Sequence, residues 1–111
     1  MFPHIDLRDW QPDGAHPGAQ WSHAGAQLIV NALYFPEGDG VPLHVNQGLD
    51  VWLVVLSGEG WAEVDAERID LHAGVCLFIP RGAERAIHAG EGGLLYASAH
   101  ATRAPLMPGG P

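Results

Sequence analysis

The chain has 111 residues, of which 47% are hydrophobic, so it is long enough for one folded domain and too short for two. Thirteen acidic residues stand against five basic ones, all arginine, and the formal net charge is −8. This balance argues against binding to nucleic acids or to anionic membranes, because both need concentrated positive charge. We therefore expect neither as a partner.

Residues 1–26 contain prolines, aromatics and histidines without helical or strand periodicity. This pattern predicts an ordered arm or an extended edge segment, with Trp10 and Trp21 packed on the rest of the domain or on a second subunit. The first residues lack the basic and apolar regions of a signal peptide. No apolar run approaches the ~20 residues that span a bilayer, so we expect a cytoplasmic protein.

The segment from residue 27 to residue 100 alternates short apolar runs with glycine and proline turns. Such spacing is typical of an all-β sandwich or barrel. The nearly continuous apolar run 50–56 predicts a strand that is buried on both faces. The glycine-rich segments 57–60 and 90–93 are predicted to be turns. The predicted strands are 27–35, 41–45, 50–56, 61–64, 69–71, 75–79, 84–88 and 94–100.

Two further segments have simple interpretations. Cys76 is the only cysteine and lies in an apolar run, so we expect a buried, unreactive thiol rather than a disulfide. Residues 104–111 are rich in proline and glycine and predict a flexible tail. The folded barrel is therefore expected to comprise residues 27–103.

Two spacings in this region carry a resemblance to a known family. The first is Gly38, five residues, His44, one residue, Asn46, four residues, Val51, six residues and Gly58. The second is Gly74, five residues, Pro80, one residue, Gly82, two residues and Arg85. Both follow the two sequence motifs of cupins, and the chain resembles a small single-domain cupin of the RmlC-like kind over roughly residues 27–100.

The resemblance implies a cupin-type double-stranded β-helix, a jelly-roll-like barrel of about eight strands, here preceded by an N-terminal arm. It also implies four metal-ligand positions, three histidines and a glutamate. This chain keeps only His44, with Asn46, Val51 and Arg85 at the other three. Arginine has no lone pair to donate and would repel a cation, so we expect no bound metal or other cofactor at these positions.

Neighbouring residues offer an alternative metal site. Iron, manganese, nickel or zinc could bind through His44, Asp50 and His88. Both Asp50 and His88 have the opposite strand parity to the family positions beside them, so this arrangement would need a β-bulge.

The remaining polar residues predict a small-molecule site inside an apolar barrel. We expect His44, Asn46, Arg85 and Tyr96 to bind a polar or anionic ligand, with Ser98 or His100 as further candidates. Arg85 offers a planar donor group suited to carboxylate, sulfate or phosphate. The alternatives are that Arg85 pairs with a surface carboxylate, that His44 is a structural histidine, and that Asn46 is a turn residue.

Three functions follow from these alternatives. The first is a metal-free binding module for a small molecule. The second is a metal-dependent enzyme of the dioxygenase or isomerase type with a rearranged site. The third is a metal-free enzyme of the sugar-epimerase kind, with His44 as the catalytic base. Whether the chain is an enzyme is left open.

The chain also contains more apolar surface than one small barrel can bury. One face of the barrel cannot bury all of this surface, which includes Trp10, Trp21, Trp52 and the run 51–56. We therefore predict a homodimer, formed by sheet-on-sheet packing or by exchange of the N-terminal arm.

Overall fold

The structure is a computed structural model that describes residues 1–8 and 10–102. The predicted tail, 104–111, lies outside the described residues. Within them the chain is all-β, and no helix is present that could cross a membrane. The strands are β1 (Gly18–Ala24), β2 (Leu28–Phe35), β3 (Gly40–Val45), β4 (Val51–Val64), β5 (Glu67–His72), β6 (Cys76–Ile79) and β7 (Glu84–Ala101).

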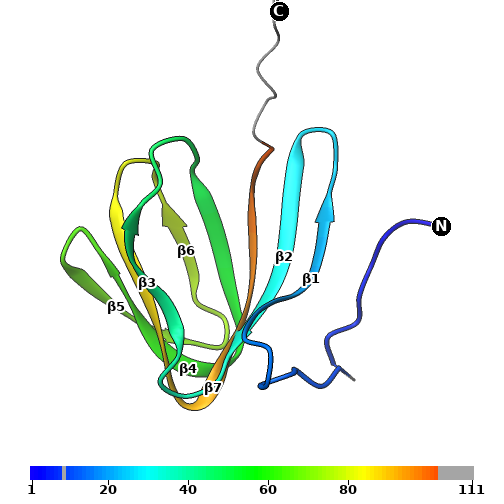
Figure 1. The fold of residues 1–111 in the computed structure, drawn as a ribbon, viewed down its shortest axis with the longest axis horizontal. Helices are drawn as coiled ribbons and strands as arrows, with labels where there is room; N and C mark the ends of the chain where they lie inside the picture. The colour runs from blue at the N-terminus through cyan, green and yellow to red at the C-terminus, as the bar shows by residue number, and fades with distance from the viewer. Residues whose placement is uncertain (9, 103–111) are drawn as a thin grey trace, which may run out of the picture.

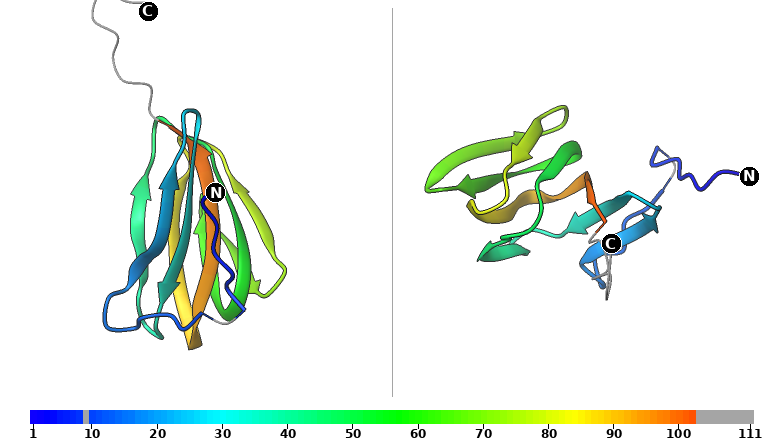
Figure 2. Two further views of the ribbon diagram at one scale, coloured as in Figure 1. Left: turned by 90° about the vertical axis from the view of Figure 1, so that its right-hand side faces the viewer. Right: turned by 90° about the horizontal axis from the view of Figure 1, so that it is seen from above.

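All pairings between these strands are antiparallel, and they form one seven-stranded sheet. The main path runs β1-β2-β7-β4-β5, with β3 paired to β7 and β6 paired to β4. In Figure 1 the long strands β4 and β7 pass through the narrow lower end, from which the other strands diverge. Seen from above, the sheet is strongly curled (Figure 2, right). The all-β, double-stranded β-helix prediction is confirmed.

The strand count differs from the predicted eight because two predicted turns are not chain reversals. Residues 57–60 continue β4, and residues 90–93 continue β7. Gly58 has a φ of +82°, and a Cβ there would lie 2.0 Å from the carbonyl oxygen of Gly93. Glycine is therefore needed here because two backbones approach closely at a bulge, not because the chain turns.

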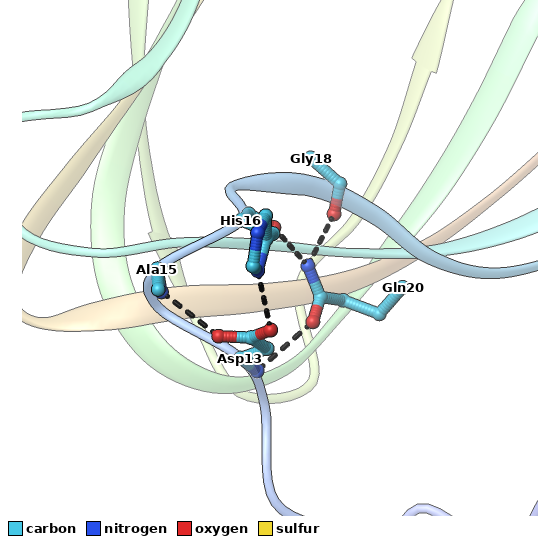
Figure 3. Close-up of polar contacts among 5 residues, drawn as sticks. All are labelled: Asp13, Ala15, His16, Gly18 and Gln20. Carbon is cyan, nitrogen blue, oxygen red and sulfur yellow. Dashed lines mark hydrogen bonds and ion pairs between the residues drawn. The ribbon is translucent and has the colours of Figure 1, made fainter.

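The N-terminal segment contributes the seventh strand. β1 lies within the segment 1–26, for which an arm or an extended edge segment was predicted, and it pairs with β2 at the edge of the sheet. A polar cluster precedes it (Figure 3): Asp13 accepts a hydrogen bond from the amide of Ala15 and contacts Nδ1 of His16 at 2.7 Å. Gln20 accepts the amide of Asp13 at 2.9 Å and donates to the carbonyl of His16 at 2.7 Å. These contacts fix the approach to β1.

The core lies on the inner face of the curled sheet. Its most deeply buried large side chains are Leu53, Val55, Leu71, Ile79 and Leu94. The prediction that the run 50–56 is buried on both faces is wrong for the single chain, because the outward-facing side chain of Trp52 is 43% exposed. The prediction of a buried Cys76 is also wrong, since this residue faces outward on the edge strand β6 and is exposed.

Candidate functional site

A cavity of about 250 Å³ opens between the strands on the inner face. The cross-strand register explains its lining, because residues directly opposite each other in antiparallel strands project to the same side. His44 faces Arg85 across β3 and β7, and Leu53 faces Ser98 across β4 and β7. The lining residues are Asn31, Leu33, Val41, His44, Asn46, Val51, Leu53, Ile79, Arg85, Ile87, Tyr96, Ser98 and His100.

Among the described residues that line the cavity, Arg85 is the only one of the Asp, Glu, Lys and Arg types, and it is 4% exposed. Its Nε donates to the carbonyl of Ala83 at 2.9 Å, and Nη2 donates to the carbonyl of Pro80 at 3.0 Å. Burial lowers the pKa of Arg85, and the negative charge of Asp65 opposes this shift. Because a guanidinium remains protonated near neutral pH, the cavity contains a fixed positive charge.

The alternative of a surface ion pair does not apply to Arg85. Its two hydrogen bonds go to backbone carbonyls, and no carboxylate forms a salt bridge with it among the described residues. A guanidinium has five N–H donors, so three are left without a protein partner in the part of the chain that the structure describes. No side-chain nitrogen of a described residue is both fully buried and unpaired. Nη1, which has no partner among the described residues, is therefore not fully buried, and Arg85 lines the cavity.

His44 lies at the rim, because it lines the cavity and is also exposed to solvent. Its Nδ1 is 2.9 Å from the carbonyl oxygen of Pro42, an acceptor, so Nδ1 carries a proton in this arrangement. In the neutral ring, Nε2 then has the free lone pair. His100 has the same arrangement, with Nδ1 3.0 Å from the carbonyl oxygen of Ala101.

Asn46 lines the cavity and also organises a turn. Its Oδ1 accepts the amides of Gly48 at 3.0 Å and of Leu49 at 3.1 Å. The Oδ1 atom of Asn46 therefore has the role of a turn residue, as in the alternative given above. Only the side-chain amide nitrogen is left to bind a ligand. The backbone carbonyl of Asn46 accepts the amide of Gly82, which connects the turn to the loop before Arg85.

Tyr96 and Ser98 provide buried hydroxyl groups on β7. Burial raises the pKa of Tyr96 well above that of a free phenol, so its hydroxyl is a neutral donor. Neither hydroxyl has a hydrogen-bond partner among the described residues, and neither is sealed from the cavity. Asn31 also lines the cavity, which the sequence analysis missed because the pairing of β2 with β7 was unknown.

The structure does not bring Asp50 and His88 to the cavity. Asp50 is exposed and accepts the amide of Arg81 at 2.9 Å. His88 lies outside the cavity lining, where it stacks on Trp61 with ring centroids 5.0 Å apart. Both residues keep the alternation of side chains expected from the sequence. Neither of these alternative metal ligands therefore points toward the cavity that His44 lines.

A comparison with known protein families identifies the family of this chain. The sequence model described as "Cupin domain" matches residues 33–95. The chain belongs to the cupin family. The matched segment reaches from β2 into β7 and includes His44, Asn46 and Arg85. None of the curated proteins compared with the chain matches it.

Solved structures extend the likeness beyond the matched segment. TT1209 from Thermus thermophilus superposes with a TM-score of 0.78 at 21% identity, over 91% of this chain and 98% of that chain. A cupin protein from Bacteroides fragilis gives 0.66 at 25% identity, over 90% and 89%. The Cnp3 cupin domain of Schizosaccharomyces pombe gives 0.68 at 19% identity, over 75% of this chain and 63%, less than two thirds, of that chain.

The four positions at which the cupin motifs carry metal ligands all line the cavity, so the motif correspondence holds in space. The donor chemistry does not fit the metal, however. Val51 has no donor atom, Arg85 is a cation, and the Oδ1 of Asn46 is engaged in its turn. Among residues 1–8 and 10–102, no three His, Cys, Asp or Glu side chains are grouped as a metal site would require.

Proposed function

We propose that this cupin is a binding protein for a small anionic molecule, held in the cavity without the tightly bound metal of the family. The single observation that carries the proposal is Arg85: a buried guanidinium that faces the cavity with no carboxylate among the lining residues. His44, Asn46 and Tyr96 provide the neighbouring polar contacts.

The energetics of Arg85 favour an anion. A buried charge without a hydrogen-bonded counter-charge is costly, and Arg85 has only the more distant charge of Asp65 and two backbone carbonyls that accept from it. A carboxylate or phosphate group could accept two parallel hydrogen bonds from the remaining donors, which is the strongest arrangement for arginine. The overall charge of −8 does not oppose this, because none of the acidic residues in the described part of the chain lines the cavity.

The rest of the cavity limits the size and shape of the ligand. Its volume of about 250 Å³ is below the ~300 to 1,000 Å³ of sites for drug-sized ligands, so we infer a small metabolite. Leu33, Leu53, Ile79 and Ile87 form an apolar wall beside the hydroxyl groups of β7. A small organic acid with an apolar body and its charged group on Arg85 satisfies both surfaces. His44, at the rim, would contact the outer end of such a ligand.

The proposal is tested by thermal-shift and calorimetric titration of the full chain. The probes are acetate, benzoate, sulfate and inorganic phosphate, with benzamide as a neutral analogue of benzoate. A ligand at 100 times its Kd adds about 2.7 kcal/mol of stability, which corresponds to roughly 10 °C in a domain of this size. We expect at least one anion to stabilise the protein and benzamide to leave it unchanged.

The matched variants are Arg85→Met and Arg81→Met. Arg81 is exposed and does not line the cavity, so its replacement removes the same charge without touching the site. We expect Arg85→Met to lose the response to anions and Arg81→Met to keep it. The proposal is wrong if no anion shifts the wild-type protein, or if Arg85→Met responds as the wild type does.

A metal-dependent cupin enzyme of the dioxygenase or isomerase type is the second candidate. The observation in its favour is that His44 and His100 both line the cavity with Nδ1 directed to a backbone carbonyl, which leaves Nε2 of each free for a ligand. Elemental analysis of protein purified without added metal separates the two candidates. Stoichiometric iron, manganese, nickel or zinc would favour the enzyme.

A further inference from the structure

Two buried hydroxyl groups of the cavity lack a partner, and they point to a second requirement on the ligand. Tyr96 is 3% exposed and Ser98 is 8% exposed, and neither hydroxyl forms a hydrogen bond with a described residue. An unpaired hydroxyl in apolar surroundings is costly. Both residues line the cavity, so water or a ligand there must supply the partner that the protein does not.

The alternation of side chains along β7 arranges these hydroxyls in depth. Tyr96, Ser98 and His100 project to one side, because residues two apart in a strand share a face. Each step along this row is about 6.6 Å. Burial increases from His100, which is partly exposed, through Ser98 to Tyr96. The row therefore descends from the rim into the cavity, along the part of β7 that rises from the narrow lower end in Figure 1.

Hydrogen bonding and strand register place the guanidinium of Arg85 near the outer end of this row. Its Nη2 donates to the carbonyl of Pro80 at 3.0 Å, and Pro80 directly follows Ile79. Ile79 pairs with Val51, the first residue of β4. An anion bound to Arg85 is therefore held level with the beginning of β4.

The same register places both hydroxyls deeper than the anion. Two residues beyond the first residue of β4, Leu53 faces Ser98, and two residues further along, Val55 faces Tyr96. The two residues with hydroxyl groups therefore lie one and two steps further into the cavity than the beginning of β4. A ligand that reaches them from Arg85 must extend along the apolar wall of the cavity.

The deep end of the cavity offers neutral donors and no counter-charge for a second acid group. Burial raises the pKa of Tyr96, so its hydroxyl keeps its proton and can donate it to an acceptor. Ser98 can also donate. Its cross-strand partner Asn31 has Oδ1 occupied by the hydroxyl of Ser22 at 2.6 Å, which leaves the side-chain amide nitrogen as a third donor. A second carboxylate here would be buried without a cation, because Arg85 is the only Lys or Arg among the described lining residues.

We propose that the ligand is a monocarboxylic acid with a hydroxyl or carbonyl oxygen remote from its carboxylate. The carboxylate binds Arg85, and the neutral oxygen accepts a hydrogen bond from Ser98 or Tyr96. This inference rests on the proposed function, because it needs an anion on Arg85, and it narrows the ligand to hydroxy and oxo acids. Unsubstituted acids would leave both hydroxyls without a ligand partner, and dicarboxylates would bury an unpaired charge.

Calorimetric titration of the full chain with matched acids tests the proposal. Pentanoate is compared with 4-oxopentanoate, and benzoate with 4-hydroxybenzoate, so that the members of each pair differ by one neutral oxygen function. We expect the substituted acid of at least one pair to bind about 3- to 10-fold more tightly than its parent, as for one added hydrogen bond. Glutarate, a dicarboxylate with as many carbons as pentanoate, should bind no more tightly than pentanoate.

A double variant, Tyr96→Phe with Ser98→Ala, removes both hydroxyls from the cavity. The preference for the substituted acid, measured as the ratio of the two Kd values, should fall to about 1 in this variant. Both Kd values come from the same variant, so a general loss of stability does not change their ratio. The matched control is Tyr34→Phe with Ser57→Ala, which removes one hydroxyl of each kind from residues that do not line the cavity. It should keep the wild-type ratio.

Failure of the ligand class can be told apart from failure of the anion site. If the parent acids bind and neither pair shows a preference, or if the double variant keeps the preference, the ligand class is wrong and the anion site stands. Tighter binding of glutarate than of 4-oxopentanoate also overturns the ligand class. If no acid binds the wild-type protein, both are wrong.

Discussion

His44 and Arg85 are direct partners across the β3–β7 ladder, and both line the same cavity. They differ in depth, since His44 is exposed at the rim and Arg85 is buried. The same two positions are metal-ligand positions in the cupin motifs, so one ligand position is kept and its neighbour is now a cation. We therefore expect Arg85 to affect both the stability of the fold and the proposed binding, and His44 to affect only the proposed binding.

Replacement of Arg85 by methionine is expected to reduce stability as well as binding. The carbonyls of Ala83 and Pro80 lose their donors, and each unpaired group costs about 1 to 3 kcal/mol where water cannot reach it. The free energy of unfolding measured in urea should fall by about 2 to 4 kcal/mol, with the fold kept at 25 °C. A variant as stable as the wild type would show that these two hydrogen bonds contribute little.

Replacement of His44 by alanine is expected to weaken anion binding and to leave the stability of the fold nearly unchanged. The ring is exposed and contacts the carbonyl of Pro42, so its loss should change the free energy of unfolding by less than about 0.5 kcal/mol. Affinity for the stabilising anion should fall by about 3- to 10-fold, as for one lost hydrogen bond. His4→Ala is the control, because His4 is exposed and its one hydrogen bond within the described residues goes to the carbonyl of Phe2. Unchanged affinity in His44→Ala would remove this residue from the site.

Tyr96 is expected to make the protein unfold at alkaline pH. Its pKa is raised by burial, so the folded state holds the phenolic proton more tightly than the unfolded chain does. The resulting stability is fully present below the unfolded pKa of about 10 and is lost as the pH rises through the folded pKa. Tyr96→Phe should therefore shift alkaline unfolding, followed by circular dichroism, to higher pH. Equal midpoints in the two proteins would contradict this.

Gly58 and Gly92 form a matched pair that separates backbone conformation from close approach. Both have a φ of +82°, but a Cβ on Gly58 would lie 2.0 Å from the carbonyl oxygen of Gly93, whereas a Cβ on Gly92 meets nothing within 4 Å. Gly92→Ala should cost about 1 to 2 kcal/mol, for the left-handed conformation alone. Gly58→Ala should cost at least about 3 kcal/mol in urea unfolding. Similar losses would show that the strands move apart easily.

Asp13 is expected to titrate below its ordinary range. The hydrogen bond from His16 lowers the pKa of Asp13 most, and the amide of Ala15 lowers it further. The contact therefore contributes above the unfolded pKa of about 3.9 and is lost as the pH falls through the lower, folded value. Carbon-detected NMR should show the midpoint of Asp13 rise in His16→Ala, though not fully, because the amide of Ala15 is retained. His4→Ala should leave it unchanged.

Residue spacing alone was enough to predict the architecture. The Gly38 to Gly58 and Gly74 to Arg85 spacings predicted a cupin, and the four positions they single out do line one cavity. These features depend on distances along one chain. Strand alternation likewise predicted that Asp50 and His88 would face away from that cavity, as they do.

Only the tertiary structure shows which residues are neighbours and which faces of the sheet are covered. Residues 57–60 and 90–93 have turn composition, yet they continue β4 and β7, because these two strands pair closely there although they are distant in sequence. Whether Arg85 is buried, whether Trp52 and Cys76 face outward, and whether Asn31 reaches the cavity all depend on cross-strand register. Register is set by long-range packing, which local sequence patterns do not contain.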